Sequence, residues 1–447
     1  MQNHDRNPRK RMHLSAQLMF TPMMHAIGSW ALPQNRTLDD FSNLGFWQDV
    51  ARTCEESFFD MCFFADHLAP DDVFRRGDRT LAIKYGVQWP VLDPLLLIPA
   101  MAAATEHVGF GATMSTSLYP PFLLARKMAT LDHVTHGRIA WNVVTSFSKT
   151  EARALGFKDM VSHDERYVQA EEYMQVCYQF WSSWAPDALI ADRSSLSLFD
   201  SSKVKYVTHA GKYYDIDGCL PVHASPQGRP VILQAGASPV GRDFAARHAE
   251  GIFSIRTTAK AMAEFGRDIR RRAEAAGRSS DDVKILFGVQ IVQGRTDAEA
   301  RDLLHHLRAN VNLDAALTKL SGRTGVDWDE VDLDSPLAPM KVPGVQGVLG
   351  MFTERPAGEG AITLRQAAIE FGVSSGSPQV VGSADTIAAE LERLFVEGEG
   401  DGFLITPAVL PESFEYFAEE VAPRLQKKGL LRTSYPTGTL RGLMAQH

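Results

Sequence analysis

The sequence predicts a (β/α)8 barrel, an α/β fold in which eight parallel strands form a ring enclosed by helices, here with insertions. Three observations favour this fold. Short apolar runs alternate with helical patterns along most of the 447 residues, which is typical of parallel sheets with right-handed crossovers. The runs are apolar on both faces, as strands covered on both sides require. About eight strand-helix units in a chain of this length fit a closed barrel better than an open sheet.

The expected elements follow one another in regular order. Strands are predicted over 13–20, 60–66, 108–115, 138–146, 229–236, 251–255, 284–293 and 401–407. Helices are predicted over 45–57, 95–105, 121–134 and 164–184 and from Pro239 onward. We expect a single domain over residues 1–447, with insertions near 70–93, 186–228 and 321–378.

Composition and charge narrow the function classes. The chain is 45% hydrophobic and carries a net charge of -8 without a concentrated basic face, so nucleic acid is not an expected partner. The longest apolar run, PLLLIPAMAAAT, is too short to span a bilayer, and the first residues lack the apolar core of a signal peptide. The four cysteines lack metal-ligand or CxxC spacing. These features predict a cytoplasmic protein with reduced thiols, no membrane partner and no metal.

Polar residues gather at four of the expected strand ends. They are Asp66, Thr113, Asn142 and the run Gly236, Ala237 and Ser238. In α/β barrels the active site lies where the carboxyl ends of the strands meet the following loops. Asn142 carries the most information, because an amide inside a buried strand is costly unless something hydrogen-bonds to it. One polar strand end is usually a turn or a cap, but four on one rim indicate a site.

Two helix starts on this rim could hold an anion. In GASPVG, Ser238 stands where a helix cap belongs, Pro239 suits the first turn, and Gly236 allows close approach of a ligand. Free N–H groups at such a helix start bind anions. In SHDERY (162–167), His163 and Tyr167 are four residues apart and project to one side of a capped helix. The pair could grip a phosphate, or it could be a simple aromatic packing contact.

Other motifs point away from competing functions. GVSSG (372–376) matches the nucleophile elbow of hydrolases, but a helix-like stretch precedes it, so we interpret it as a flexible loop and disfavour a hydrolase centred on Ser374. No GxGxxG follows an expected strand and no GxxxxGK[ST] occurs, so nucleotide fingerprints are absent from the sequence.

These residues resemble the bacterial-luciferase-like, FMN-dependent monooxygenases, in particular the branch of nitrilotriacetate monooxygenase, pristinamycin IIA synthase and dibenzothiophene sulfone monooxygenase. The similarity runs over nearly the whole chain. Its longest segments are FFADHLA (63–69), TEHVGFGATMSTSLYPPFLLAR (105–126), GRIAWNVVTS (137–146), SPQGRPVILQAGASPVGRDFAA (225–246) and DGFLITPAVLP (401–411). The resemblance implies a barrel that holds FMN, as FMNH2, across its C-terminal rim. It assigns the phosphate to Tyr167, Ser238 and the helix start after Gly236, and the ribityl chain or ring edge to Asp66, Thr113 and Asn142, with His163 as a further contact.

The resemblance also implies a two-component reaction. A separate NAD(P)H-dependent flavin reductase would supply FMNH2 by diffusion, and the barrel would use O2 to oxygenate a small organic substrate. The missing dinucleotide fingerprint fits an enzyme that leaves nicotinamide to its partner. Family members are often homodimers or homotetramers. A non-catalytic flavin-binding barrel is the contrasting hypothesis.

By family position, residues 20–30 line the substrate pocket. The expected apolar wall consists of Phe20, Met23, Met24, Ile27 and Trp30. Such a wall favours an organosulfur, aromatic or halogenated compound over an aminopolycarboxylate. His25 matches a pocket histidine and is the candidate for proton transfer or substrate orientation, with a packing role as the alternative. Arg323 stands where the sulfone branch carries His, and it could bind an oxyanion or face solvent from a lid.

Overall fold

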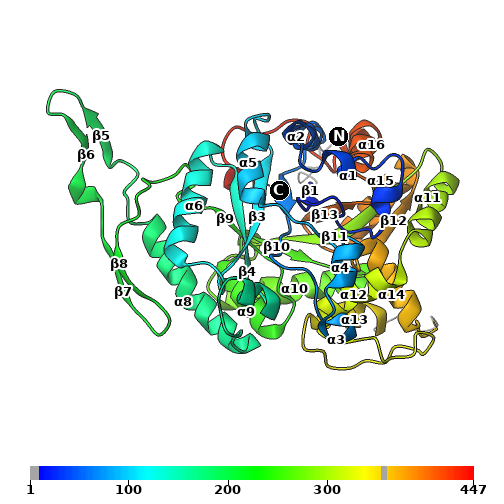
Figure 1. The fold of residues 1–447 in the computed structure, drawn as a ribbon. Coiled ribbons are helices and arrows are strands. Elements are labelled where there is room, and N and C mark those ends of the chain that lie inside the picture. Colours follow the sequence, from blue (N-terminus) through cyan, green and yellow to red (C-terminus); the bar gives the residue numbers. More distant parts are fainter. Residues whose placement is uncertain (1–9, 354–359, 447) are drawn as a thin grey trace.

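A closed ring of parallel strands forms the centre of the molecule (Figure 1). The computed structural model describes residues 10–353 and 360–446. Within them the ring consists of β1 (His13–Leu18), β2 (Met61–Phe64), β3 (Gly109–Ser115), β4 (Ile139–Val144), β9 (Val231–Gln234), β10 (Gly251–Ser254), β11 (Lys284–Gln293) and β13 (Gly402–Pro407). Each strand pairs in parallel with the next, and β13 pairs with β1 to close the ring. The predicted barrel and its strands are confirmed.

Helices surround the ring. They are α2 (Leu44–Glu56), α5 (Pro94–Ala102), α6 (Pro121–Val134), α8 (His163–Trp181), α9 (Pro239–His248), α10 (Ala259–Ala275), α11 (Asp297–Ala309), α15 (Ala384–Glu397) and α17 (Ala422–Lys427). Their starts follow local rules: Asp93 caps α5 by accepting from the N–H of Leu95 at 2.9 Å, and Ser238 caps α9. Large side chains such as Trp47, Trp141 and Phe180 fill the layer between strands and helices.

A short helix, α18 (Leu440–Met444), fills the N-terminal end of the barrel. Leu440, Leu443 and Met444 pack against Met61, Phe63 and other inward-facing strand residues. The packing is close, because a Cβ atom on Gly109 would lie 2.7 Å from Cδ1 of Leu440. The barrel is therefore closed at this end by its own chain.

A buried charge network lies beside this closed end. The Asp60 carboxylate accepts from the guanidinium of Arg432 at 2.8 Å and from the N–H of Leu14 at 2.7 Å, and it lies 3.1 Å from Nδ1 of His13. Burial alone would raise the pKa of Asp60, but Arg432 and His13 hold it below its usual range. Arg432 and His13 offset the cost of burying this carboxylate, although Nη1 of Arg432 is itself buried without a hydrogen-bond partner.

The insertions form two distinct structures. Residues 70–93 contain α3 (Phe74–Gly77) and α4 (Thr80–Lys84), which share a second hydrophobic core with α12 (Leu313–Thr324), α13 (Gln346–Thr353) and α14 (Leu364–Ser374). Because α12 begins at Leu313, this insertion starts before the predicted residue 321. Residues 186–228 instead form two hairpins, made of β5 (Leu189–Asp192) with β6 (Ser197–Phe199) and of β7 (Val207–Ala210) with β8 (Asp215–Gly218). The hairpins project from the barrel (Figure 1).

Two details differ from the sequence-based expectations. A further strand, β12 (Gln379–Gly382), pairs with the second half of β11. The GVSSG motif is not a flexible loop: Ser374 is the last residue of α14, and its hydroxyl donates to the carbonyl of Glu370 at 3.3 Å. A nucleophile elbow needs a strand before its serine, so this motif does not form one.

Candidate active site at the carboxyl ends of the strands

Asn142 points into the barrel with one half of its amide unsatisfied. On β4, Trp141 packs outward against the helices, and alternation along the strand therefore turns Asn142 inward. Its Nδ2 group donates to Oγ1 of Thr113 on the neighbouring strand at 3.0 Å, and that hydroxyl donates to the carbonyl of Phe64 at 2.8 Å. The Oδ1 atom of Asn142 is buried without a hydrogen-bond partner. Such an orphaned acceptor costs about 1–3 kcal/mol and is satisfied when a ligand donates to it.

The start of α9 forms a cradle without side chains in it. A Cβ atom on Gly236 would lie 2.4 Å from Nε2 of Gln234 and 3.0 Å from the Tyr167 hydroxyl. One on Gly241 would lie 2.8 Å from the same hydroxyl. Ser238 caps the helix by accepting from the N–H of Gly241 at 3.2 Å. Burial raises the pKa of Tyr167, so its hydroxyl keeps its proton and can donate. The backbone N–H groups of the helix start and the two hydroxyls are donors of the kind that bind a phosphate group.

Neighbouring residues frame this cradle. The ring of His163, the first residue of α8, lies edge-on to that of Tyr167 with centroids 5.3 Å apart, and its side chain is 49% exposed. The carbonyl of Ala237 accepts from Nε of Arg242 at 2.9 Å, which fixes the turn before α9. Ser162 caps α8 as predicted, but Glu165 pairs with Lys212 at 2.7 Å instead of completing a capping box. The residues predicted to bind the phosphate, Tyr167, Gly236 and Ser238, therefore lie close together.

Asp66 follows β2 at the same end of the barrel. Burial raises its pKa to about 7, and the negative charges of Asp93 and Glu151 act in the same direction. Glu151 accepts from the N–H of Leu68 at 2.8 Å, and burial raises its pKa as well. The Asp66 carboxyl thus exchanges its proton near neutral pH, which is typical of functional sites.

The loop after β1 holds the residues predicted to contact substrate. Phe20 and Met24 pack into the barrel's outer core, where the Phe20 and Trp47 rings lie 5.5 Å apart. Met23 and Ile27 belong to the second core, and Trp30 is 45% exposed. The structure therefore divides these five side chains between two cores and the surface, and it does not gather them into one hydrophobic cluster.

His25 and Arg323, far apart in sequence, lie in one polar cluster. His25 is 4% exposed and its Nε2 atom is buried without a partner. Burial lowers the pKa of His25 to about 3, assisted by the positive charges of Lys319 and Arg323, so the ring is neutral. Arg323 donates to Oε1 of Gln88 at 2.7 Å. Burial, together with Arg323, also lowers the pKa of His67 to about 3.

Sequence reasoning missed His67, Asp71, Gln88 and Lys319. Of these, Lys319 had a detectable signal, because it lies on the apolar face of α12, between Ala316 and Leu320. Asp71 had none, since only the fold brings it to α12: a Cβ atom on Gly322 would lie 2.2 Å from its Oδ1. No group of three or more His, Cys, Asp or Glu side chains in the described ranges could hold a metal ion. Nor does any described helix combine the length and apolarity needed to cross a bilayer.

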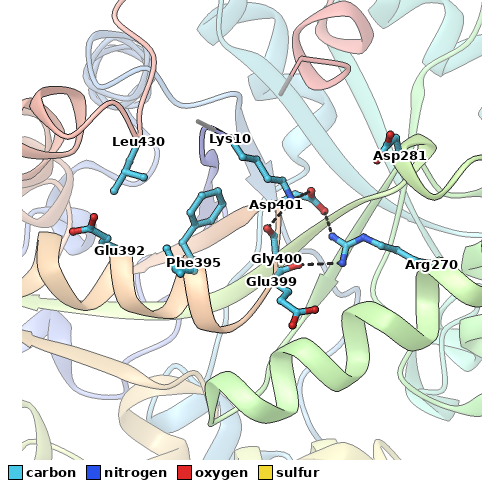
Figure 2. Close-up of a pocket in the computed structure, with 10 residues that line it drawn as sticks. Lys10, Arg270, Asp281, Glu392, Phe395, Glu399, Gly400, Asp401 and Leu430 are labelled. Carbon is cyan, nitrogen blue, oxygen red and sulfur yellow. Dashed lines mark hydrogen bonds and ion pairs between the residues drawn. The ribbon is translucent and has the colours of Figure 1, made fainter. Parts of the chain in front are cut away.

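A cavity of about 520 Å³ lies at the other end of the barrel, near the start of β13. Figure 2 shows Lys10 and Arg270 reaching Asp401 beside Phe395 and Leu430. Lys10 and Arg270 lie 2.5 Å and 3.0 Å from the Asp401 carboxylate, so both cations are already paired. Because the strands begin here, this cavity is remote from Asn142 and Ser238, and it is not the candidate site.

Comparison with known proteins agrees with this geometry. The family model described as Luciferase-like monooxygenase matches residues 24–398. The dibenzothiophene-sulfone monooxygenase of Rhodococcus erythropolis (strain XP) is 39% identical over 97% of this chain and 96% of that protein. The dimethyl-sulfide monooxygenase of Hyphomicrobium sulfonivorans is 39% identical over 97% of this chain and 90% of that protein. The crystal structure of a riboflavin lyase with modified FMN and riboflavin matches with a TM-score of 0.89 and 31% identity, over 98% of this chain and 96% of that one. The chain is therefore a member of the luciferase-like monooxygenase family.

Proposed function

We propose that this monooxygenase uses FMNH2 and O2 to oxygenate a small, largely apolar organic molecule, for which organosulfur compounds are the first candidates. The observation that carries the proposal is the rim that joins Asn142, with its orphaned amide oxygen, to the glycine-lined cradle at the start of α9. The two features lie on β4 and on the loop after β9, which are neighbours in the barrel. Their spacing along adjacent strand ends suits a ligand with a phosphate at one end and a hydrogen-bonding ring system at the other.

In this proposal each rim residue has a binding task. Ser238, Tyr167 and the N–H groups of the first turn of α9 hold the phosphate, while Gly236 leaves space for it. Asn142, fixed by Thr113, offers its Oδ1 atom to an N–H or O–H of the flavin. When bound, reduced FMN supplies the electrons that activate O2 for transfer of one oxygen atom to the substrate. The protein orients both reactants and excludes water.

His25 and Arg323 are the proposed substrate-side groups. The neutral imidazole of His25 can accept or donate a hydrogen bond at its unpaired Nε2 atom. Arg323 has donors beyond the one used by Gln88, and these can bind an oxygen atom of the substrate. The positive charges of Lys319 and Arg323 are opposed by Asp71 and Glu151 in the same cluster. That balance favours a polar but uncharged group, such as a sulfone or sulfoxide, over a polyanion such as nitrilotriacetate.

A reductase partner is part of the proposal. The sequence lacks a dinucleotide fingerprint, so the reducing equivalents would arrive on FMN that a separate NAD(P)H-dependent enzyme has reduced. If so, the barrel needs no reductase once FMNH2 is provided by other means. Photochemically reduced FMN is therefore expected to support turnover.

An anaerobic titration followed by single turnovers tests the function. The protein is titrated with FMNH2 and with oxidised FMN, then mixed with ¹⁸O2 and dibenzothiophene sulfone, dimethyl sulfide or nitrilotriacetate. We expect tighter binding of FMNH2 than of FMN and one ¹⁸O atom in a product of an organosulfur compound. Incorporation of ¹⁸O only into a nitrilotriacetate product would move the substrate class to aminopolycarboxylates. Flavin binding with no labelled product from any of the three would favour a flavin-binding protein without this oxygenase activity.

A further inference from the structure

A lysine side chain lies in the interior between α12 and the loop after β1. Lys319 is 1% exposed, and its Nζ atom donates to the main-chain carbonyl of His25 at 2.6 Å. The same atom lies 5.5 Å from the centre of the Phe371 ring, in cation–π geometry. Its neighbours on the same helix face, Ala315 and Ala316, are apolar and fully buried. A lysine has thus taken a position that the pattern of the helix assigns to a hydrophobic residue, and burial lowers its pKa to about 7.

Stability does not explain this choice of residue. Removing an ammonium group from water costs several kcal/mol, and an apolar residue of similar volume is often as stable or more stable in such a place. An ammonium has three N–H donors, of which one is used by the His25 carbonyl. Asp71, whose carboxylate lies against Gly322 on the next turn of α12, offsets part of the charge. What the lysine provides, and Leu or Met could not, is a hydrogen-bond donor to the chain at His25.

Lys319 binds the loop after β1, which carries His25, the proposed substrate-side histidine. The carbonyl of His25 accepts from Lys319. Two residues further on, the N–H of Ile27 donates to the carbonyl of Gly372 at 2.8 Å. The loop is therefore attached to α12 at His25 and to α14 at Ile27. The His25 imidazole has an unpaired buried Nε2 atom, and fixing the main chain at this residue limits where that atom can lie.

We propose that Lys319 is a positioning residue for the oxygenation reaction, which acts by holding the His25 main chain and so directing the His25 imidazole at the substrate. The inference rests on the proposed function and goes beyond it by naming the residue that organises the substrate side. Lys319 does not contact the flavin cradle, because it belongs to the layer formed by α12 and α14 and the cradle is built on α8 and α9. Loss of the Lys319 side chain is expected to lower turnover of the substrate and to leave the affinity for FMNH2 unchanged.

The test compares Lys319→Met, which keeps the length and removes the donor, with Lys319→Arg, which retains a cation and donors. Leu320→Met is the matched control, a volume-conserving change of the adjacent fully buried residue. Each protein is assayed for FMNH2 affinity, for product formed per FMNH2 oxidised with dibenzothiophene sulfone or dimethyl sulfide, and for amide hydrogen exchange in residues 20–30. A double variant, Lys319→Met with Asp71→Asn, keeps the buried charges balanced should the single variant fail to fold.

We expect Lys319→Met to lower kcat/KM by roughly a hundredfold, as a misplacement of about 1 Å can do, with most of the loss in kcat. Amide exchange in residues 20–30 is expected to accelerate, while FMNH2 affinity stays within about twofold of the wild type. Lys319→Arg should recover most of the activity, and Leu320→Met should match the wild type.

Three results would overturn the inference while leaving the proposed function intact: an unchanged product yield in Lys319→Met, an equal loss in Leu320→Met, or a loss of FMNH2 affinity as large as the loss of turnover. A wild type that binds FMNH2 and oxygenates none of the panel would instead remove the proposed function, and with it this inference.

Discussion

The two ends of the barrel differ in how their buried polar groups are paired. At the N-terminal end, Asp60 is surrounded by Arg432, His13 and the N–H of Leu14, and Arg432 and His13 hold its pKa below the usual range. At the C-terminal end, Asn142 and His25 each bury a polar atom without a partner. The first arrangement stabilises the protein by itself. The second contains the two unpaired atoms that we propose to contact the flavin and the substrate.

This difference is more informative than the size of a cavity. The 520 Å³ cavity lies at the N-terminal end, where Lys10 and Arg270 already share Asp401. The C-terminal end offers orphaned acceptors, a cradle closed by glycines, and carboxyl and imidazole groups with displaced pKa values. Five substitutions, one at the N-terminal end and four at the C-terminal end, can test this comparison.

The largest effect is expected at the satisfied end. Asp60→Ala leaves Arg432 buried without its counter-charge and should lower the free energy of unfolding by about 3–5 kcal/mol. Urea denaturation measures the change, and FMNH2 affinity of the folded protein should remain that of the wild type. Asp192→Ala on the exposed β5–β6 hairpin is the control and should change stability by less than about 0.5 kcal/mol. A comparable loss of FMNH2 affinity in Asp60→Ala would break the comparison between the two ends.

The next effect concerns the cradle at the start of α9. Tyr167→Phe and Ser238→Ala should each weaken FMNH2 binding by about 1.5–3 kcal/mol, the contribution of a hydrogen bond to a charged group. Anaerobic titration gives the affinities. Ser238→Ala also removes a helix cap, so Thr296→Ala, which removes the cap of α11 far from the cradle, shows what cap loss alone does. If both cradle variants bind FMNH2 as well as the wild type does, the phosphate assignment is wrong.

A third test uses pH. The folded-state pKa of Asp66 is about 7, above its unfolded value, so the folded protein binds more protons between about pH 4 and pH 7 and loses stability as pH rises through that window. Asp66→Asn removes this loss. The variant should exceed the wild type by on the order of 2 kcal/mol at pH 8 and show no such gain at pH 4. An equal difference at both pH values would contradict the assigned titration.

The smallest expected effect is a gain in the stability of the flavin-free protein. Asn142→Leu removes the buried orphaned acceptor, so the flavin-free protein should become more stable by roughly 1 kcal/mol. The same variant should lose affinity for FMNH2, because the ligand loses its acceptor. Thermal unfolding of the flavin-free protein and titration with FMNH2 measure the two changes. Destabilisation together with normal FMNH2 affinity would show that Asn142 serves the fold.

The barrel could be predicted because buried parallel strands appear in the sequence as apolar runs. Each strand of the ring lies within its predicted range. The sequence pattern missed β12, a four-residue strand whose burial alternates, and the hairpins of residues 186–228, whose β5 strand is exposed at every position. Exposed strands need no apolar pattern, so periodicity does not reveal them. The structure shows why they persist: Glu172 on α8 accepts from the N–H groups of Lys212, Tyr213 and Tyr214.

The residues of the candidate site also divide into those with a local sequence signal and those without one. The Thr113–Asn142 pair and the cradle around Gly236 lie on strand ends and a helix start, where local residue types carry the signal. Lys319 and Asp71 were not predicted, because their partners are set by tertiary packing: the Lys319–His25 hydrogen bond joins residues 294 positions apart. The residues proposed as an apolar wall stay a prediction, and the structure places Phe20 and Met24 in one core and Met23 and Ile27 in another.

The pairing of β1 with β13, which closes the ring, is expected to form late in folding. The proposed flavin-binding rim comes from one continuous stretch, β2 to α9, whose strands pair with their immediate neighbours. The last pairing, β1 with β13, joins residues such as Gln17 and Thr406 that are 389 positions apart. Distant pairings form slowly, and until they form the two open edges can pair with other chains. We expect a refolding intermediate with a native-like flavin cradle and an unformed substrate side, so that FMN captured early would guide the chain toward closure and away from aggregation.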